Sequence, residues 1–107
     1  MVTRKKSKKV RIRRLKNSIK FYLPRVEGYL EVITDLAKEY EGMSLIEFDG
    51  YFENKVEPAK YMRAEVHTRK LIEKRIIDQA KKMRDRLKQK SLALEINGEL
   101  ILVEQDR

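Results

Sequence analysis

The uneven distribution of charge limits which part of this chain can enter a folded core. The sequence has 26 Lys and Arg against 17 Asp and Glu, and ten of the cations but none of the acids lie in the first 20 residues. Ten cations without a counter-charge repel one another in water, so this basic segment (residues 1–20) is expected to stay extended until a polyanion neutralises it. The folded body is therefore expected to form from the nearly neutral remainder.

The length of 107 residues allows one domain with at most an appended arm. Residues 1–9 carry almost no apolar side chains and are typical of a disordered segment. We predict a flexible basic arm over residues 1–11 and a single small α+β domain over residues 12–107. With 41% apolar residues the core is thin, and self-association would extend it.

Apolar residues recur every three or four positions from residue 12 to residue 40, which is the spacing of one helix face. Pro24 interrupts this pattern, and proline is tolerated at the first position of a helix. We therefore predict that the basic segment is helical from residue 12 to about 21 and that a main helix spans about 24–41. A kinked continuous helix and an extended segment over residues 10–23 are the alternatives. The apolar residues are Ile12, Leu15, Ile19, Tyr22, Val26, Tyr29, Ile33, Leu36 and Tyr40.

A second helical pattern begins at Pro58 and places apolar residues from Met62 to Leu87 on one face. It predicts a second main helix over about 58–90. At 1.5 Å per residue, such a helix would span about 50 Å if straight, which exceeds the diameter of a compact domain of this size. We therefore expect it to protrude, to bend near His67 and Thr68, or to pair with another subunit.

Two pairs of short apolar runs are separated by turn residues and predict β-hairpins. Asp49-Gly50 is the turn of the first hairpin, and Asn97-Gly98 is the turn of the second, over residues 92–104. In the second hairpin Leu94 is expected to face Ile101 and Leu92 to face Val103 on one side, with Ala93 and Leu102 opposite, so both faces are partly apolar. An isolated two-stranded ribbon is marginal in water. It must therefore be covered by the rest of the fold or by a second copy of the chain. The predicted fold class is α+β, with two main helices and two short hairpins.

Charged side chains form two rows on the predicted helices. An acidic ridge of Glu27, Glu31, Asp35 and Glu39 has a four-residue spacing at which neighbours repel one another, so it is expected to pair with the second helix. Alternatively, the acidic ridge competes with nucleic acid for the basic segment. A row of five cations follows one face of the second predicted helix, where it either contacts phosphates or is an ordinary solvated surface. These cations are Arg63, Lys70, Lys74, Lys81 and Lys88.

Nucleic acid is the polyanion that this charge distribution favours. We predict a non-catalytic nucleic-acid-binding protein, of accessory, architectural or regulatory type, and the sequence does not distinguish DNA from RNA or single from double strands. The basic segment would supply most of the affinity, and the row of five cations would orient the complex. The alternative is an assembly subunit of a ribonucleoprotein, virus or plasmid system that adds a strand through its C-terminal hairpin. The predicted contacts in the basic segment are Arg4, Lys5, Lys6, Lys8, Lys9, Arg11, Arg13, Arg14, Lys16 and Lys20.

No pattern of catalytic residues is visible in the sequence. His67 is the sole histidine, cysteine is absent, and there is no glycine-rich phosphate loop, so we expect no enzyme activity, cofactor or metal. The tyrosines and phenylalanines are expected to pack in the core rather than to stack on bases. No apolar run is long enough to span a membrane, and we expect a cytoplasmic or nucleoid-associated homo-oligomer, with a dimer favoured.

Overall fold

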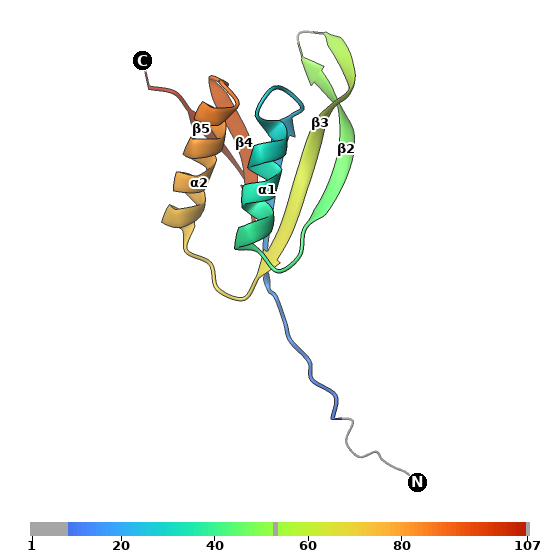
Figure 1. Cartoon of the computed structure of the whole chain (residues 1–107), viewed down its shortest axis with the longest axis vertical. Helices are drawn as coiled ribbons and strands as arrows, with labels where there is room; N and C mark the ends of the chain where they lie inside the picture. The colour runs from blue at the N-terminus through green and yellow to red at the C-terminus, as the bar shows by residue number, and fades with distance from the viewer. Residues whose placement is uncertain (1–8, 53, 107) are drawn as a thin grey trace.

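The computed structural model describes residues 9–52 and 54–106, which form five strands and two helices in the order β1-α1-β2-β3-α2-β4-β5. The strands make one antiparallel sheet with the order β2-β3-β1-β4-β5. Both helices lie on one face of this sheet, and no helix of the described residues lies on the other, open face (Figure 1). The elements are β1 (Asn17–Pro24), α1 (Tyr29–Glu39), β2 (Ser44–Phe52), β3 (Lys55–Thr68), α2 (Glu73–Arg86), β4 (Ser91–Ile96) and β5 (Glu99–Glu104).

The first six elements follow the split β-α-β pattern of ferredoxin-like folds, with β1 at the centre between β3 and β4. Strand β5 extends the sheet beyond β4. The predicted fold class is therefore wrong in its proportion of strand to helix. A five-stranded sheet dominates the fold, and the two helices cover only one side of it. The two predicted main helices exist, within narrower limits than the sequence indicated.

Strand β1 occupies the region in which the sequence analysis favoured a helix. Ile19, Phe21 and Leu23 are fully buried and alternate with more exposed residues, which is the period of a half-covered strand. The 3,4 spacing that runs through the same region is incidental here, because two neighbouring strands pair with β1 along its length. The helix predicted from residue 12 is wrong, and the extended alternative holds for residues 17–23.

The second predicted helix is shortened by strand β3. Residues 58–68 belong to β3, whose Ala64 and Val66 are fully buried, and α2 occupies only Glu73–Arg86 of the predicted 58–90. Pro58 lies where the β2–β3 register shifts, between the pairs Phe48↔Tyr61 and Gly50↔Glu57. A bulge of this kind leaves residues outside the hydrogen-bonded ladder, so a proline is tolerated there.

One of the two predicted hairpin turns is confirmed. Asn97 and Gly98 form the β4–β5 turn with φ angles of 51° and 86°, and the predicted facing pairs Leu94↔Ile101 and Leu92↔Val103 are present. The turn predicted at Asp49-Gly50 is wrong. Both residues lie inside β2, and the β2–β3 hairpin turns further along the chain, next to Asn54.

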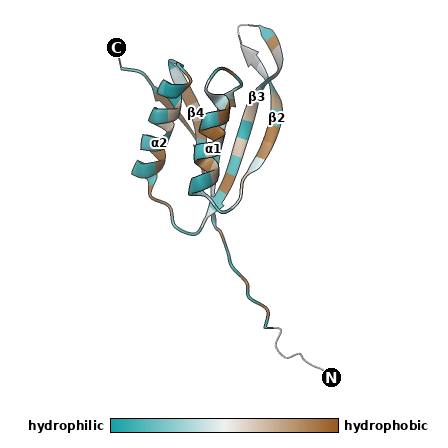
Figure 2. Ribbon diagram, viewed as in Figure 1, coloured by the Kyte–Doolittle hydropathy of each residue, from teal (hydrophilic) through white to brown (hydrophobic). Residues whose placement is uncertain are grey.

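The core lies between the sheet and the two helices. Val32 and Leu36 of α1 and Ile76, Ala80 and Met83 of α2 are buried against the inner face of the sheet. Figure 2 shows the outer side of α2 as hydrophilic and the strands as alternating bands of hydrophilic and hydrophobic residues. Within the described residues, neither helix is long and apolar enough to cross a membrane. The division into an arm and one domain stays a prediction.

Candidate functional site

Five polar side chains converge at the centre of the open face of the sheet. Lys20 pairs in register with Glu65 of β3 and with Glu95 of β4, and Tyr22 pairs with Arg63 of β3. Paired residues of neighbouring strands point to the same face. Ile19 and Phe21, between them in β1, point into the core, so these five residues point the opposite way. We call them the open-face cluster: Lys20, Tyr22, Arg63, Glu65 and Glu95.

Lys20 links the two carboxylates of this cluster. Its Nζ lies 3.7 Å from Glu65 Oε2 and 3.6 Å from Glu95 Oε2. The Tyr22 hydroxyl donates a hydrogen bond of 2.6 Å to Glu95 Oε1, and Arg63 Nη2 lies 3.9 Å from Glu65 Oε2. The charged side chains are 21–31% exposed, so they are partly withdrawn from water while a ligand can still reach them.

The environment fixes the protonation states of Tyr22 and Glu95. Burial raises the pKa of Tyr22 above its usual 10.0, and the hydrogen bond to Glu95 raises it further. The same hydrogen bond lowers the pKa of Glu95 below its usual 4.5; partial burial opposes this shift, and the charge of Lys20 supports it. At neutral pH Tyr22 is therefore a hydrogen-bond donor and Glu95 is an anion.

An aromatic hollow adjoins the cluster. Phe48 and Tyr61 stack with ring centroids 5.5 Å apart, and Tyr22 meets Phe48 edge to face at 5.8 Å. These rings, together with Ala93, Glu95 and Leu100, line a space of about 590 Å³, a volume within the usual range of about 300–1,000 Å³ for small-molecule sites. The cluster and this hollow together are called the open-face site.

Gly50 is required for the shape of the hollow. A Cβ atom at this position would clash with the Tyr61 ring, so the ring can cross β2 only because residue 50 has no side chain. The bulge beside Gly50 changes the register of β2 and β3 at this point. Bulges frequently re-aim side chains next to functional sites, and this one lies directly at the wall of the hollow.

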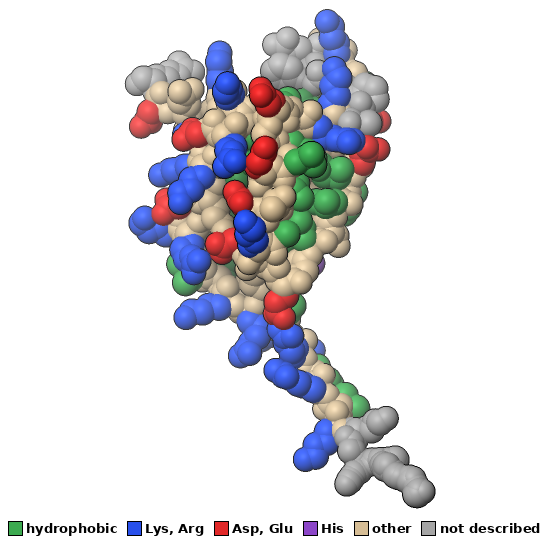
Figure 3. Space-filling view, viewed as in Figure 1, with side chains coloured by type: hydrophobic (Ala, Val, Ile, Leu, Met, Phe, Trp, Pro, Cys, Tyr) green, Lys and Arg blue, Asp and Glu red, His purple; other side chains and the backbone are tan. Residues whose placement is uncertain are grey.

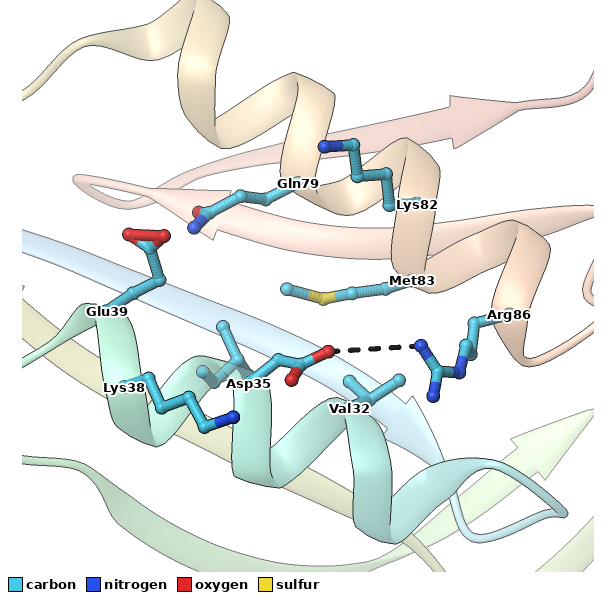
Figure 4. Close-up of a pocket in the computed structure, with 9 residues that line it drawn as sticks. Val32, Asp35, Lys38, Glu39, Gln79, Lys82, Met83 and Arg86 are labelled. Atoms are coloured by element: carbon cyan, nitrogen blue, oxygen red, sulfur yellow. Dashed lines mark ion pairs between the residues drawn. The ribbon is translucent and has the colours of Figure 1, made fainter.

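A second hollow, of about 360 Å³, lies between α1 and α2 (Figure 4). Val32, Leu36 and Met83 line its apolar part, and Asp35 faces Arg86 across it at 3.9 Å. The ion pair of Arg75 with Glu39 (3.6 Å) also joins the two helices. These contacts confirm the predicted pairing with the second helix for two of the four ridge residues, Asp35 and Glu39. Because the opposite charges beside this hollow already pair with one another, we interpret the hollow as a feature of helix packing and not as a ligand site.

The described cations of the basic segment are mostly exposed where the chain extends away from the sheet (Figure 3). Arg13 pairs with Glu41, and Lys20 belongs to the open-face cluster. The predicted contacts Arg4, Lys5, Lys6 and Lys8 lie outside the described residues. The other predicted contacts of this segment are exposed: Lys9, Arg11, Arg14 and Lys16. Their role in binding nucleic acid stays a prediction.

The predicted row of cations along one helix does not exist. Arg63 belongs to β3 and points to the open face, whereas Lys74 and Lys81 lie on α2, where Lys74 pairs with Asp78 at 3.1 Å. The row was projected onto a continuous helix, and residues on a strand and on a helix do not share that geometry. The remaining two members, Lys70 and Lys88, are exposed just before and just after α2.

Sequence reasoning missed Tyr22, Glu65 and Glu95 as site residues, because it assigned Tyr22 to a helix seam, Glu65 to the second predicted helix and Glu95 to the second predicted hairpin. The available signal was the alternation of polar residues, tyrosine included, with apolar residues over 61–67 and over 19–23. That alternation predicts strands with one polar face. It does not reveal that three such strands lie side by side, because their pairing joins residues far apart in the sequence.

The comparisons with known proteins give a match in structure alone. No protein-family model and no curated protein sequence matches the chain. The structure is similar to that of a phage SAM lyase in complex with S-methyl-5'-thioadenosine, with a TM-score of 0.64, 14% sequence identity and coverage of 92% of this chain and 97% of the other. It is also similar to a phage SAM lyase in the apo state, with a TM-score of 0.60, 13% identity and coverage of 92% and 98%.

These similarities correct two predictions made from the sequence. A non-catalytic nucleic-acid-binding protein, or a non-catalytic assembly subunit, was expected, and the absence of an enzyme activity was expected with it. Both predictions are contradicted, because two solved structures that are similar over nearly the whole chain are those of an enzyme. At this level of identity the similarity establishes the fold alone.

Proposed function

We propose that this chain is an enzyme that cleaves a carbon–sulfur bond of S-adenosylmethionine (SAM) and releases S-methyl-5'-thioadenosine at the open-face site. The observation that carries the proposal is the open-face cluster, five converging polar groups on the sheet of a fold shared with SAM lyase. Perturbed and partly buried ionisable groups beside a hollow are the usual signature of an active site.

The chemistry of the site suits a sulfonium substrate. SAM carries a positive charge on sulfur, and cleavage moves both electrons of the carbon–sulfur bond to sulfur, which becomes a neutral thioether. A lyase adds no water, so the carbon released from sulfur forms its new bond within the substrate's own amino-acid portion. The anionic Glu95 and the rings of Tyr22 and Phe48 favour a cation beside them.

The hollow also suits the nucleoside portion. Its volume of about 590 Å³ lies within the range of small-molecule sites, and aromatic rings offer flat surfaces on which a base can stack. In this arrangement the nucleoside lies against Phe48 and Tyr61, and the charged end of the substrate reaches the open-face cluster. Tyr22 and Lys20 act as positioning residues that hold Glu95 in place.

The experiment is incubation of the purified full-length chain with SAM, followed by chromatography and mass spectrometry for S-methyl-5'-thioadenosine. We expect release of this product by the natural chain and at least a tenfold lower rate for Glu95→Gln. The matched control is Glu47→Gln, which changes a carboxylate of β2 that pairs with Arg25 outside the cluster. Equal rates for Glu95→Gln and the natural chain, or no product from the natural chain, would overturn the proposal.

Self-association remains part of the proposal. Leu100 and Leu102 of β5 are 60% and 55% exposed, and their register with Glu95 and Ala93 places them on the open face beside the cluster. Apolar side chains exposed together at a sheet edge favour contact with another chain. We expect a homo-oligomer, and light scattering at several protein concentrations measures it. A monomer at all concentrations would contradict this expectation.

A further inference from the structure

The guanidinium of Arg63 carries a donor that the other members of the open-face cluster leave without a partner. Its Nε is enclosed and has no hydrogen-bond partner among the described residues. Its ion pair with Glu65 spans 3.9 Å, which is longer than a hydrogen bond. An enclosed donor without an acceptor is rare in folded proteins and calls for a physical explanation.

Lys20 contacts both carboxylates of the cluster but does not neutralise them alone. Its ammonium lies 3.7 Å from Glu65 Oε2 and 3.6 Å from Glu95 Oε2, and one positive charge beside two negative charges leaves a net charge of −1. Arg63 brings the charge of the cluster to zero, yet its Nε makes no hydrogen bond to either carboxylate. A guanidinium has a planar set of donors that matches a carboxylate, so the natural ligand of such a group is an anion with two oxygens.

Glu65 supplies the opposite charge immediately beside Arg63. The two residues are two positions apart in β3 and therefore point to the same face. Arg63 Nη2 lies 3.9 Å from Glu65 Oε2. In an α-amino acid the carboxylate and the ammonium are attached to one carbon, so recognition of both needs a cation and an anion side by side. Arg63 and Glu65 provide this pair, and their combined charge is zero, as is that of the amino-acid group.

We infer that Arg63 and Glu65 form the subsite for the α-amino-acid end of the substrate, with Arg63 holding its carboxylate and Glu65 its ammonium. This inference rests on the proposed function and specifies which end of the substrate meets which strand. The nucleoside then lies toward the aromatic hollow, next to Tyr22 and Phe48. The subsite discriminates between ligands that carry the amino-acid group and ligands that lack it.

The test compares two thioether ligands by calorimetry on the full-length chain. S-adenosylhomocysteine and S-methyl-5'-thioadenosine share the nucleoside and an uncharged sulfur, and only the first carries the amino-acid group. We expect the natural chain to bind S-adenosylhomocysteine more tightly. Arg63→Gln should weaken that ligand about 10- to 100-fold, the effect of losing a charge-assisted pair, and leave S-methyl-5'-thioadenosine unchanged.

Two further variants keep the result interpretable. Arg63→Lys retains the charge without the planar donor set and should give an intermediate affinity for S-adenosylhomocysteine. Arg75→Gln removes an arginine of α2 that pairs with Glu39 and should change neither ligand. Equal losses for both ligands in Arg63→Gln, or no loss for either, would overturn the subsite. Failure of the natural chain to bind either ligand would instead overturn the proposed function.

Discussion

The hydrogen bond between Tyr22 and Glu95 gives a quantitative test of the open-face cluster. Tyr22→Phe removes the hydroxyl that donates to Glu95 Oε1 at 2.6 Å and keeps the ring that packs against Phe48. A hydrogen bond to a charged group contributes about 1.5–3 kcal/mol to stability. Glu95 is 25% exposed, so water replaces part of that contribution, and we expect the variant to lose about 1 kcal/mol of unfolding free energy.

The effect of this substitution should depend on pH in a defined direction. The hydrogen bond from Tyr22 lowers the pKa of Glu95 in the folded protein below its unfolded value of 4.5. A lowered carboxyl pKa contributes stability above the unfolded pKa, and this contribution disappears as the pH falls through the folded pKa. The difference between the natural chain and Tyr22→Phe is therefore expected to be full at neutral pH and to shrink below pH 4.5.

Urea denaturation at a series of pH values measures this difference. At neutral pH the loss corresponds to a melting temperature lowered by about 4–8 °C for a domain of this size. Tyr29→Phe is the matched control, because Tyr29 packs at the edge of the core without a hydroxyl contact to the cluster. A difference that stays constant from neutral to acid pH, or no difference at neutral pH, would refute the link between Tyr22 and an ionised Glu95.

Two further predictions concern the support of the site. Phe21→Ala empties a fully buried position of the central strand and should cost about 3–5 kcal/mol of unfolding free energy; Leu30→Ala, at a residue 72% exposed, should change it little in the same urea experiment. Gly50→Ala places a methyl group against the Tyr61 ring and should cost about 1–3 kcal/mol while weakening binding of S-methyl-5'-thioadenosine. Unaltered binding in Gly50→Ala would show that the Tyr61 ring does not shape the ligand site.

The part of the fold that local signals determine was predictable from the sequence. The Asn97-Gly98 turn and the facing pairs of β4 and β5 were assigned correctly, because a two-residue turn fixes the register of the strands beside it. Strand β1 was predicted only as an alternative to a helix, and β3 was predicted as part of a helix, because the partners of both strands are distant in the chain. Ile19, for example, pairs with Val66 and Ile96.

Phe21 is a signal in the sequence against the predicted helix. It lies off the helical seam that was traced through Ile19 and Tyr22, yet it is fully buried at the centre of the sheet. A large apolar residue outside the seam contradicts a helix with one apolar face and agrees with the alternation of Ile19, Phe21 and Leu23. The open-face cluster could not be predicted from the sequence, because it unites residues of three strands whose pairing joins distant parts of the chain.

Chemical-shift mapping with S-methyl-5'-thioadenosine tests the location of the active site most directly. Titration of the isotopically labelled full-length chain should perturb the amide signals of Tyr22, Phe48, Tyr61 and Glu95 on the open face, and leave those of Val32 and Met83 between the helices unchanged. Shifts that gather instead around the groove between α1 and α2, or the absence of any shift at saturating ligand, would contradict the account.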